Sequence, residues 1–292
     1  TLKKIYKIGE IIENNNSDDM KEINGLIAQL WYTRDTRSSK PNPLDEVKSL
    51  IFYLDILYRN VYNDLISDQD ISNGSSNFNI SFGSWVGADK DGNPYVTTKV
   101  TKEALKIYSN QIISIYKEKI IELSDDFSVS TNFVDCPEHL QRRIKNYSIL
   151  LKKEFEHYSK VNFDEPFRIF LSLVFHRLEN FQLNNKGYES FNDFLEDMEI
   201  FQNSVNDVFG KNFRISKLDD FVDYVKQFEF HGVTLDIRQN SSIINSKKGK
   251  IYKDFINLIK DIPELQNIYG KKVFNSIILS MTKSHQDMLN LF

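Results

Sequence analysis

The 292-residue chain is long enough for one large domain or two smaller ones, and its composition (40 % hydrophobic, 27 % charged) is ordinary for a soluble globular protein. Its net charge of −4 argues against nucleic acid or an anionic membrane as the main partner, because both favour a concentrated basic face. The single cysteine, Cys136, cannot form an internal disulfide, and no apolar run approaches the length of a membrane span. We therefore expect a cytoplasmic protein.

Helical periodicity dominates the chain. Apolar residues repeat at steps of three and four over 20–30, which predicts a helix with one apolar face. Asn42 followed by Pro43 is typical of a helix N-cap and first turn. Another helix is predicted after the Thr-rich segment 97–101. Further helices are expected near residues 137–160, 165–181, 189–208, 217–229 and 249–260.

Three short segments, near 78–85, 232–238 and 274–281, are predicted as strands because they are rich in β-branched and aromatic residues. Long helical stretches separate the first two strands, with a helical insertion at 97–229, so the strands should be parallel. The predicted fold class is mainly α, with the strands in a parallel sheet or in an α/β (TIM-type) barrel that has large helical insertions. The polar segment 68–77 is the clearest predicted surface loop.

The densest functional signal is the loop at 83–94, which contains three glycines, two acids, a lysine and an Asn-Pro turn. Glycines allow a close approach to a ligand, and a cation suits an anionic substrate. The alternative is a turn whose charges face water. The loop is not a calcium loop, because Gly92 stands at its fourth position and Val100 at its twelfth. It also lacks the spacing of a phosphate-binding P-loop or a dinucleotide fingerprint.

The second signal is the charged pair within the predicted strand near 232–238. If the strand buries Leu235 and Ile237, alternation places Asp236 and Arg238 on its other face. At the carboxyl end of a barrel strand, such a charge lines the mouth of the active site. The alternative is an ion pair between Asp236 and Arg238 on a sheet face. The five histidines show no metal-ligand spacing, and no motif for a covalent nucleophile is present.

Five segments, in this order, resemble phosphoenolpyruvate carboxylases. Residues 84–94 read SWVGADKDGNP and are similar to that family's signature SW(I/M)GGDRDGNP. Residues 235–239 match its LDIRQ segment. The other three similar stretches are the LW…PxPxDE region at 30–46, EPFR at 165–168 and SMTKS with the following aspartate at 280–287.

The resemblance implies a lyase that carboxylates phosphoenolpyruvate with bicarbonate, giving oxaloacetate and phosphate with the help of Mg²⁺ or Mn²⁺. Arg238 would be a catalytic and substrate-binding donor to phosphate or carboxyphosphate oxygens. Trp85 would shield the methylene carbon of the enolate, and Lys90 would lie near the anions or pair with a neighbouring acid. Residues expected to shape the site are Gly87, Asp89, Asp91, Gly92 and Asn93. Such enzymes are homo-oligomers, so a tetramer is implied.

The sequence departs from the family pattern at three positions. Lys90 replaces the usual arginine and loses its bidentate fork, and Ala88 replaces the second glycine of the signature. Ser38 stands where the family often has a second arginine beside Arg37, which puts a sugar-phosphate activator site in doubt. The strand-end residues remain, which favours a working enzyme as the parent protein.

Several parts of the family's active site are expected outside this chain. The histidine-bearing TAHPTE segment is expected before Thr1, and the mobile loop and the carboxylates that bind the metal are expected beyond Phe292. The resemblance therefore implies an internal piece of the enzyme, one partial domain spanning 1–292 with an incomplete TIM-type barrel. We expect this piece to have no metal ligands of its own and to be inactive alone. The alternative is a degenerate homologue that acts as a helical interaction or regulatory module.

Overall fold

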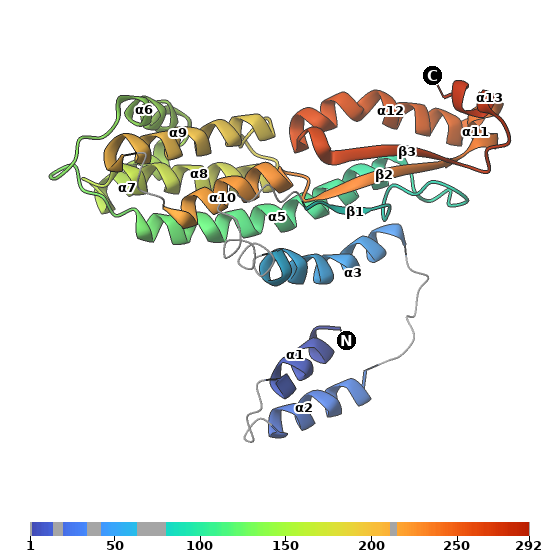
Figure 1. Ribbon diagram of the computed structural model, residues 1–292, viewed down its shortest axis with the longest axis horizontal. Helices are drawn as coiled ribbons and strands as arrows, with labels where there is room; N and C mark the ends of the chain where they lie inside the picture. Colours follow the sequence, from blue (N-terminus) through green and yellow to red (C-terminus); the bar gives the residue numbers. More distant parts are fainter. Residues whose placement is uncertain (1, 14–19, 34–41, 63–79, 211–214, 292) are drawn as a thin grey trace. The chain divides into compact units, whose positions relative to one another are not determined.

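The computed structural model describes residues 2–13, 20–33, 42–62, 80–210 and 215–291 (Figure 1). The chain divides into two compact units, residues 1–77 and 78–292. It is mainly helical (70 %) with three short parallel strands, which confirms this part of the predicted fold class. Within the described ranges, no helix is both long and apolar enough to cross a lipid bilayer.

The first unit is helical throughout its described part. It contains α1 (Leu2–Glu13), α2 (Met20–Trp31) and α3 (Pro43–Ile56), which continues into a π-helical turn (Leu57–Val61). The predicted cap of α3 is confirmed: Oδ1 of Asn42 accepts from the amide of Asp45 at 3.0 Å, and the Asp45 carboxylate accepts from the amide of Asn42 at 3.0 Å. The predicted loop 68–77 and the positions Arg37 and Ser38 lie outside the described residues.

The second unit contains a helical bundle built along one long helix, α5 (Thr98–Asp126), whose amino end is capped by Thr97. Figure 1 shows the other bundle helices gathered beside it. They are α6 (Glu138–Leu150), α7 (Lys152–Val161), α8 (Pro166–Gln182), α9 (Phe191–Phe209) and α10 (Ser216–Phe228). Instead of the single helix predicted over 137–160 there are two, because the backbone leaves the helical region at Leu151 (φ −121°, ψ 51°).

A charged cluster lies inside this bundle. The carboxylate of Asp197 is fully buried and accepts hydrogen bonds from the hydroxyls of Tyr147 and Tyr188, each at 2.5 Å. Arg143 and Arg177 lie 2.9 Å and 3.7 Å from the two carboxylate oxygens. The cluster joins α6, α8, α9 and the loop before α9, and a buried charge is tolerated here because it is both paired and hydrogen-bonded.

The three strands form one parallel sheet in the order β1 (Phe82–Ser84), β2 (Val233–Asn240), β3 (Phe274–Ser280). Phe82 pairs with Val233, and Leu235 pairs with Phe274; the register shifts before Ile237 pairs with Ile277. The sheet confirms that the three predicted segments lie side by side and run in parallel. Three paired strands do not make a closed barrel, so the barrel stays a prediction.

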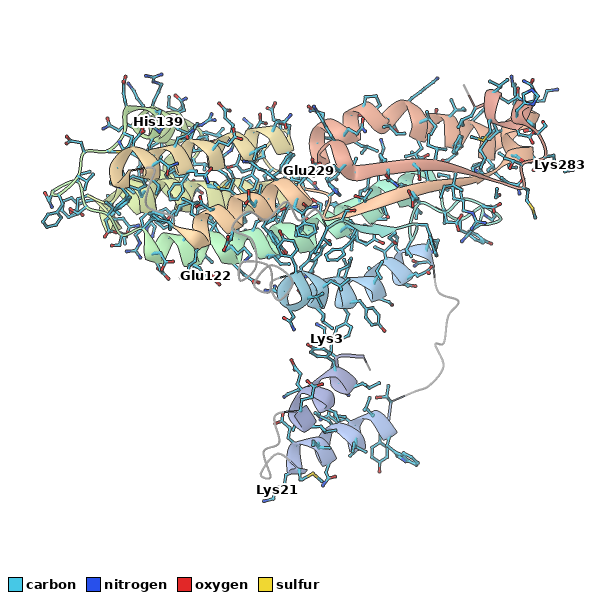
Figure 2. The ribbon with its side chains drawn as sticks, in the orientation of Figure 1. Lys3, Lys21, Glu122, His139, Glu229 and Lys283 are labelled. Carbon is cyan, nitrogen blue, oxygen red and sulfur yellow. The ribbon has the colours of Figure 1, made fainter. Side chains whose placement is uncertain are left out.

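Helices α11 (Ser241–Ser246) and α12 (Gly249–Tyr269) follow β2 in the chain, and α13 (His285–Leu289) follows β3. Helix α12 continues beyond the predicted end at 260, through Pro263 to Tyr269. It stops at Gly270 (φ 108°), where a Cβ would lie 2.0 Å from Oε2 of Glu229. Figure 2 labels Glu229 at the point where α10 leads into β2. A larger residue at this position would push these segments apart.

Candidate functional site

The glycine-rich loop after β1 lies beside the carboxyl-terminal half of β2. The amide of Lys90 donates to the carbonyl of Arg238 at 2.8 Å, and the amide of Arg238 donates to the carbonyl of Ala88 at 3.2 Å. These bonds extend the parallel pairing beyond the end of β1, so that Asp89 stands opposite Arg238. Gly87 makes the turn into this segment at φ 90°, a conformation that side chains with a Cβ rarely adopt.

Arg238 lies on the half-exposed face of β2, as the alternation predicted. Leu235 and Ile237 are fully buried on the opposite face, while the Arg238 side chain is 43 % exposed. Its Nη1 lies 3.4 Å from Oδ2 of Asp89, and its Nη2 lies 3.2 Å from Oδ2 of Asp91. The guanidinium group is therefore shared between two carboxylates of the loop.

The alternative ion pair between Asp236 and Arg238 is not formed. The carboxylate of Asp236 instead accepts from the hydroxyl of Ser276 at 2.6 Å and from the amide of Asn275 at 3.3 Å, both on β3. Arg238 thus contacts the loop, and Asp236 contacts the neighbouring strand.

Asp91 is held as an anion by its neighbours. The pKa of its carboxyl is lowered by the Ser280 hydroxyl first, and then by the Asn240 amide and the Arg238 charge, against the opposing effect of burial. The Asn240 amide donates to Oδ1 of Asp91 at 3.2 Å, and the backbone amide of Asp91 donates to Asp89 at 3.1 Å. A fixed anion at Asp91 keeps Arg238 oriented along this edge of the sheet.

Lys90 does not form the pair with Asp89 or Asp91 that the sequence suggested. Its side chain is only 2 % exposed, and its ammonium group donates to the carbonyl of Val96 and to Oδ2 of Asp254, both at 2.9 Å. The reason is the parallel pairing of the loop with β2, which gives Lys90 a buried position and leaves the two acids beside Arg238. Burial lowers the pKa of this lysine, and its contacts with Asp254 oppose that effect.

Asp254 on α12 also holds the start of α5. Its carboxylate accepts from the backbone amide of Thr98 at 2.9 Å, and its carbonyl accepts from the Thr98 hydroxyl at 2.7 Å. An anion at this place also suits the positive end of the helix dipole. Lys90 and Asp254 therefore tie the glycine-rich loop to two helices.

Trp85 is the residue directly after β1, and the residue is 62 % exposed. Ser84, the last residue of β1, pairs with Leu235, and Arg238 lies farther toward the carboxyl end of β2. Trp85 and Arg238 therefore both lie on the carboxyl-terminal side of the sheet. Farther along the loop, Gly92 adopts φ 68° and Oδ1 of Asn93 accepts from the backbone amide of Tyr95 at 3.1 Å. These two residues shape the turn rather than present a charge.

A cavity of about 300 Å³ lies between this loop and the segment after β2. Its lining residues are Lys90, Gly92, Asn93, Pro94, Gln239, Asn240, Ser242, Ile243 and Ile251. Gln239 belongs to the buried face of β2, whereas Arg238 belongs to the other face. Asn240, another lining residue, lies on the same face as Arg238, so the cavity adjoins the carboxyl end of β2 from both faces of the strand.

Three residues of this arrangement were missed by sequence reasoning. Asn240 stands two residues after Arg238 on the same strand face, so the period of two could have identified it. Ser280 pairs with Asn240 across the sheet, which only the register of β3 reveals. Asp254 lies on a helix far along the chain, and no local pattern marks it as the partner of Lys90.

No group of three or more His, Cys, Asp or Glu side chains that could hold a metal ion is found within the described ranges. Asp89 and Asp91 face the guanidinium group of Arg238, which would compete with a cation for the same oxygens. The arrangement is therefore an arginine held between two acids and partly open to solvent. Such an arginine can exchange its carboxylate partners for the oxygens of an anionic ligand.

Comparison with known proteins points to the same family as the segments 84–94 and 235–239. The family model described as phosphoenolpyruvate carboxylase matches residues 2–253. The chain is similar to the phosphoenolpyruvate carboxylase of a Nostoc species, with 27 % identity over 264 residues that cover 82 % of this chain and 25 % of that protein. It is also similar to the one of Prochlorococcus marinus, with 23 % identity over 99 % of this chain and 37 % of the relative.

A shorter match with higher identity links the chain to the phosphoenolpyruvate carboxylase of Psychromonas ingrahamii, with 33 % identity over 131 residues, or 42 % of this chain and 15 % of the relative. The chain spans about a quarter of the length of the curated relatives it matches first. The family match covers the strand-end loop, the arginine strand and the whole helical bundle. The chain therefore belongs to the phosphoenolpyruvate carboxylase family.

Proposed function

We propose that this chain supplies part of the substrate site of a phosphoenolpyruvate carboxylase, with Arg238 as the residue that binds the transferred phosphate. In this reaction, bicarbonate oxygen attacks phosphorus, the bond from phosphorus to the enol oxygen breaks, and carboxyphosphate and the enolate of pyruvate result. The enolate carbon then bonds to the carbon dioxide released from carboxyphosphate, giving oxaloacetate and phosphate. The observation that carries the proposal is the partly exposed guanidinium group between Asp89 and Asp91.

Arg238 suits the phosphate because its present bonds are long for charge-assisted pairs. At 3.4 Å and 3.2 Å, its contacts with the two acids exceed the roughly 2.8 Å typical of such bonds. A phosphate group offers three oxygens to the same planar fork and can draw one or both nitrogens away from the acids. The positive charge would then offset the negative charge of the phosphoryl oxygens while this group passes from the enol oxygen to the bicarbonate oxygen.

We assign the loop a shaping role and Trp85 a shielding role. The exposed indole, directly after β1, would cover the methylene carbon of the enolate once substrate is bound and so limit its protonation by water. Gly87, Asp89, Asp91, Gly92 and Asn93 set the path of the loop. For Lys90 to reach a substrate, it would have to leave Val96 and Asp254, so we place its contribution in holding the loop.

The remaining features of the site are proposed from the family. The metal, Mg²⁺ or Mn²⁺, would stabilise the enolate, and its ligands would come from parts of the enzyme other than the described residues. The three strands would form one arc of an α/β barrel completed by the same polypeptide. Bicarbonate is the second substrate, and a homotetramer in the cytoplasm is the proposed assembly. We assign no step of the reaction to the metal in this chain.

The proposal is tested first by binding. Calorimetric titration of this chain with phosphoenolpyruvate should give a dissociation constant that rises on the order of tenfold or more in Arg238→Ala, as expected for loss of a charge-assisted contact. Arg238→Lys should fall between the two because it keeps the charge without the fork. The matched control is Lys99→Ala, whose side chain is 85 % exposed on α5. Equal affinity in wild type and Arg238→Ala would contradict the assignment and favour the regulatory-module alternative.

The second test uses a complete enzyme that contains this chain. Arg238→Ala should lower kcat by on the order of 10²–10³, as for the loss of one preorganised donor in a transition state. Lys90→Ala should lower kcat less and should lower the thermal midpoint more, because Lys90 is buried in a structural pair. Oxaloacetate formation, coupled to malate dehydrogenase, measures the first effect, and a melting curve measures the second. If Lys90→Ala lost more activity than Arg238→Ala without losing stability, the two roles would have to be exchanged.

A further inference from the structure

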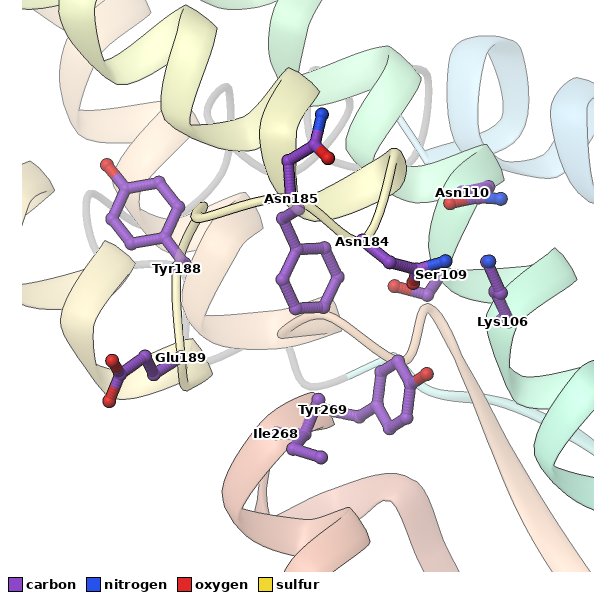
Figure 3. A pocket seen from close by; sticks show the side chains of 10 residues that line it. Lys106, Ser109, Asn110, Asn184, Asn185, Tyr188, Glu189, Ile268 and Tyr269 are labelled. Carbon is purple, nitrogen blue, oxygen red and sulfur yellow. The ribbon is translucent and has the colours of Figure 1, made fainter. Parts of the chain in front are cut away.

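A second cavity, of about 270 Å³, lies at the other end of the sheet from Arg238. It is open to solvent on one side and bordered by α5, the loop between α8 and α9, and the end of α12 (Figure 3). Tyr269, one of its lining residues, stands just before β3, whereas Arg238 pairs with Ile278 farther along that strand. The cavity is therefore separate from the site described above, and neither the sequence motifs nor the proposed reaction makes use of it.

The walls of this cavity are held in place without a ligand. In the loop, the amide of Asn185 donates to the carbonyl of Asn180 at 2.8 Å, and Nη2 of Arg177 donates to the carbonyl of Gly187 at 3.2 Å. A Cβ at Gly187 would lie 2.3 Å from the backbone nitrogen of Phe181, so only glycine fits there. A pocket that is preformed in this way binds a ligand without first having to order its own loop.

One buried hydroxyl in the cavity has no partner. Ser109 is 1 % exposed, and its Oγ makes no hydrogen bond with any residue in the described ranges. An unpaired buried hydroxyl forgoes the hydrogen bonds that it would make in water, so such groups normally have a partner. Lys106 stands three residues earlier, on the same face of α5, and no described acid pairs with it. Both side chains line the cavity, as Figure 3 shows.

The neighbouring groups favour a ligand that accepts hydrogen bonds. Burial raises the pKa of Tyr269, so its hydroxyl stays protonated at neutral pH and can donate. The side-chain amide of Asn184, a residue in the left-handed conformation (φ 55°), is available on the loop side. The hydroxyl of Tyr188 is already bonded to Asp197, so this residue offers only its ring. Glu189 is the acid among the lining residues.

We propose that this cavity binds a small hydroxy acid, whose carboxylate would accept hydrogen bonds from the Lys106 ammonium group and the Ser109 hydroxyl. Its hydroxyl groups would bond to Asn184 and Tyr269. The lining contains one cation, Lys106, and one acid, Glu189, so its formal charges cancel. A ligand with a single negative charge is therefore tolerated better than a phosphate, which carries close to two. The proposal does not depend on the role of Arg238.

Glycerate is the probe that tests this assignment, because it has one carboxylate and two hydroxyls on three carbons. Calorimetric titration of this chain with glycerate should show saturable binding at one site, and glycerol, which lacks the charge, should bind at least tenfold more weakly. Inorganic phosphate should also bind more weakly than glycerate. Absence of saturable glycerate binding, or tighter binding of phosphate, would overturn the proposal.

Variants then locate the binding. Lys106→Met keeps most of the apolar stem and should raise the dissociation constant of glycerate about tenfold. Ser109→Ala should raise it several-fold and leave the thermal midpoint unchanged or higher, since it removes an unpaired polar group. Lys99→Met, on the exposed surface of the same helix, and Arg238→Ala should leave it unchanged. Unchanged glycerate affinity in both Lys106→Met and Ser109→Ala would place the ligand elsewhere and refute the inference.

Discussion

At the scale of single residues, the two basic side chains of the candidate site have opposite environments. Lys90 is buried against Val96 and Asp254, while Arg238 is 43 % exposed and faces two acids. A lysine at the position of the family's usual arginine is compatible with this burial, because one ammonium group can satisfy a carbonyl and a carboxylate without a planar fork. The departure from the family pattern thus falls on a residue that stabilises the loop.

Lys90→Met is expected to destabilise the folded chain by about 2–3 kcal/mol, because it leaves the carboxylate of Asp254 without its cation. Chemical denaturation with urea measures this loss as a lower transition midpoint. Lys99→Met is the control, since an 85 % exposed lysine with a distant partner contributes little. The double variant Lys90→Met with Asp254→Asn should recover part of the loss, and no recovery would show that the pair is not the cause.

The sequence predicted the orientation of these residues better than their partners. The period of two in β2 correctly assigned Leu235 and Ile237 to the buried face and Arg238 to the other. It could not predict that Arg238 contacts Asp89 and Asp91, because those contacts depend on how the loop pairs with the strand. Contacts between residues far apart in sequence come from register and packing, which local patterns do not encode.

At the scale of elements, local signals located the helices well and their ends less well. Asn42 was identified as a cap because its chemistry is local, and the structure confirms it. The break at Leu151 and the continuation of α12 past Pro263 were not predicted. Both depend on packing: the bundle requires two helices around the break, and α12 extends as far as Gly270, the residue that fits beside Glu229.

Helix α13 offers a pH-dependent element. The pKa of Asp287 is lowered by hydrogen bonds from the amide of Lys283, from the side chain of Asn245 and from the amide of Ser284. The carboxylate is the form that makes these bonds, so their stabilising effect is fully present above about pH 4, the usual carboxyl pKa. It is lost as the pH falls through the lower pKa of the folded state.

Hydrogen exchange followed by NMR should detect this loss. We expect the amides of Lys283 and Ser284 to be protected at neutral pH and to lose protection as the pH falls below about 4. Asp287→Asn should show reduced protection at neutral pH and a weaker pH dependence. Glu199→Gln, on the exposed surface of α9, should behave as wild type. Protection that is equally strong in Asp287→Asn and wild type would show that the carboxylate does not hold this turn.

At the scale of the whole molecule, the chain spans about a quarter of its first-matched relatives. The family's TAHPTE segment is not found among the 292 residues, and the described ranges contain no candidate metal cluster. Catalytic groups that act as one unit leave little activity when several are missing. We therefore propose that this chain alone does not form oxaloacetate.

The assay for this prediction supplies phosphoenolpyruvate, bicarbonate and Mg²⁺ and follows oxaloacetate through coupled reduction to malate. The rate with the chain should equal the rate without it. A complete phosphoenolpyruvate carboxylase is the positive control for the coupling enzymes. Turnover that exceeds background and disappears in Arg238→Ala would contradict the prediction and would mean that the chain holds a complete site.

The pairing of β1 with β2 has a consequence for the order in which the chain folds. Phe82 must meet Val233, and all the bundle helices from α5 to α10 lie between them in sequence. Helices form from nearby residues within microseconds, whereas contacts across such a long separation must first overcome the entropy of closing a large loop. We therefore expect the bundle to form before the sheet. The strand pairing that places Arg238 beside Asp89 and Asp91 would then form late, after the bundle helices, which contain none of these three residues.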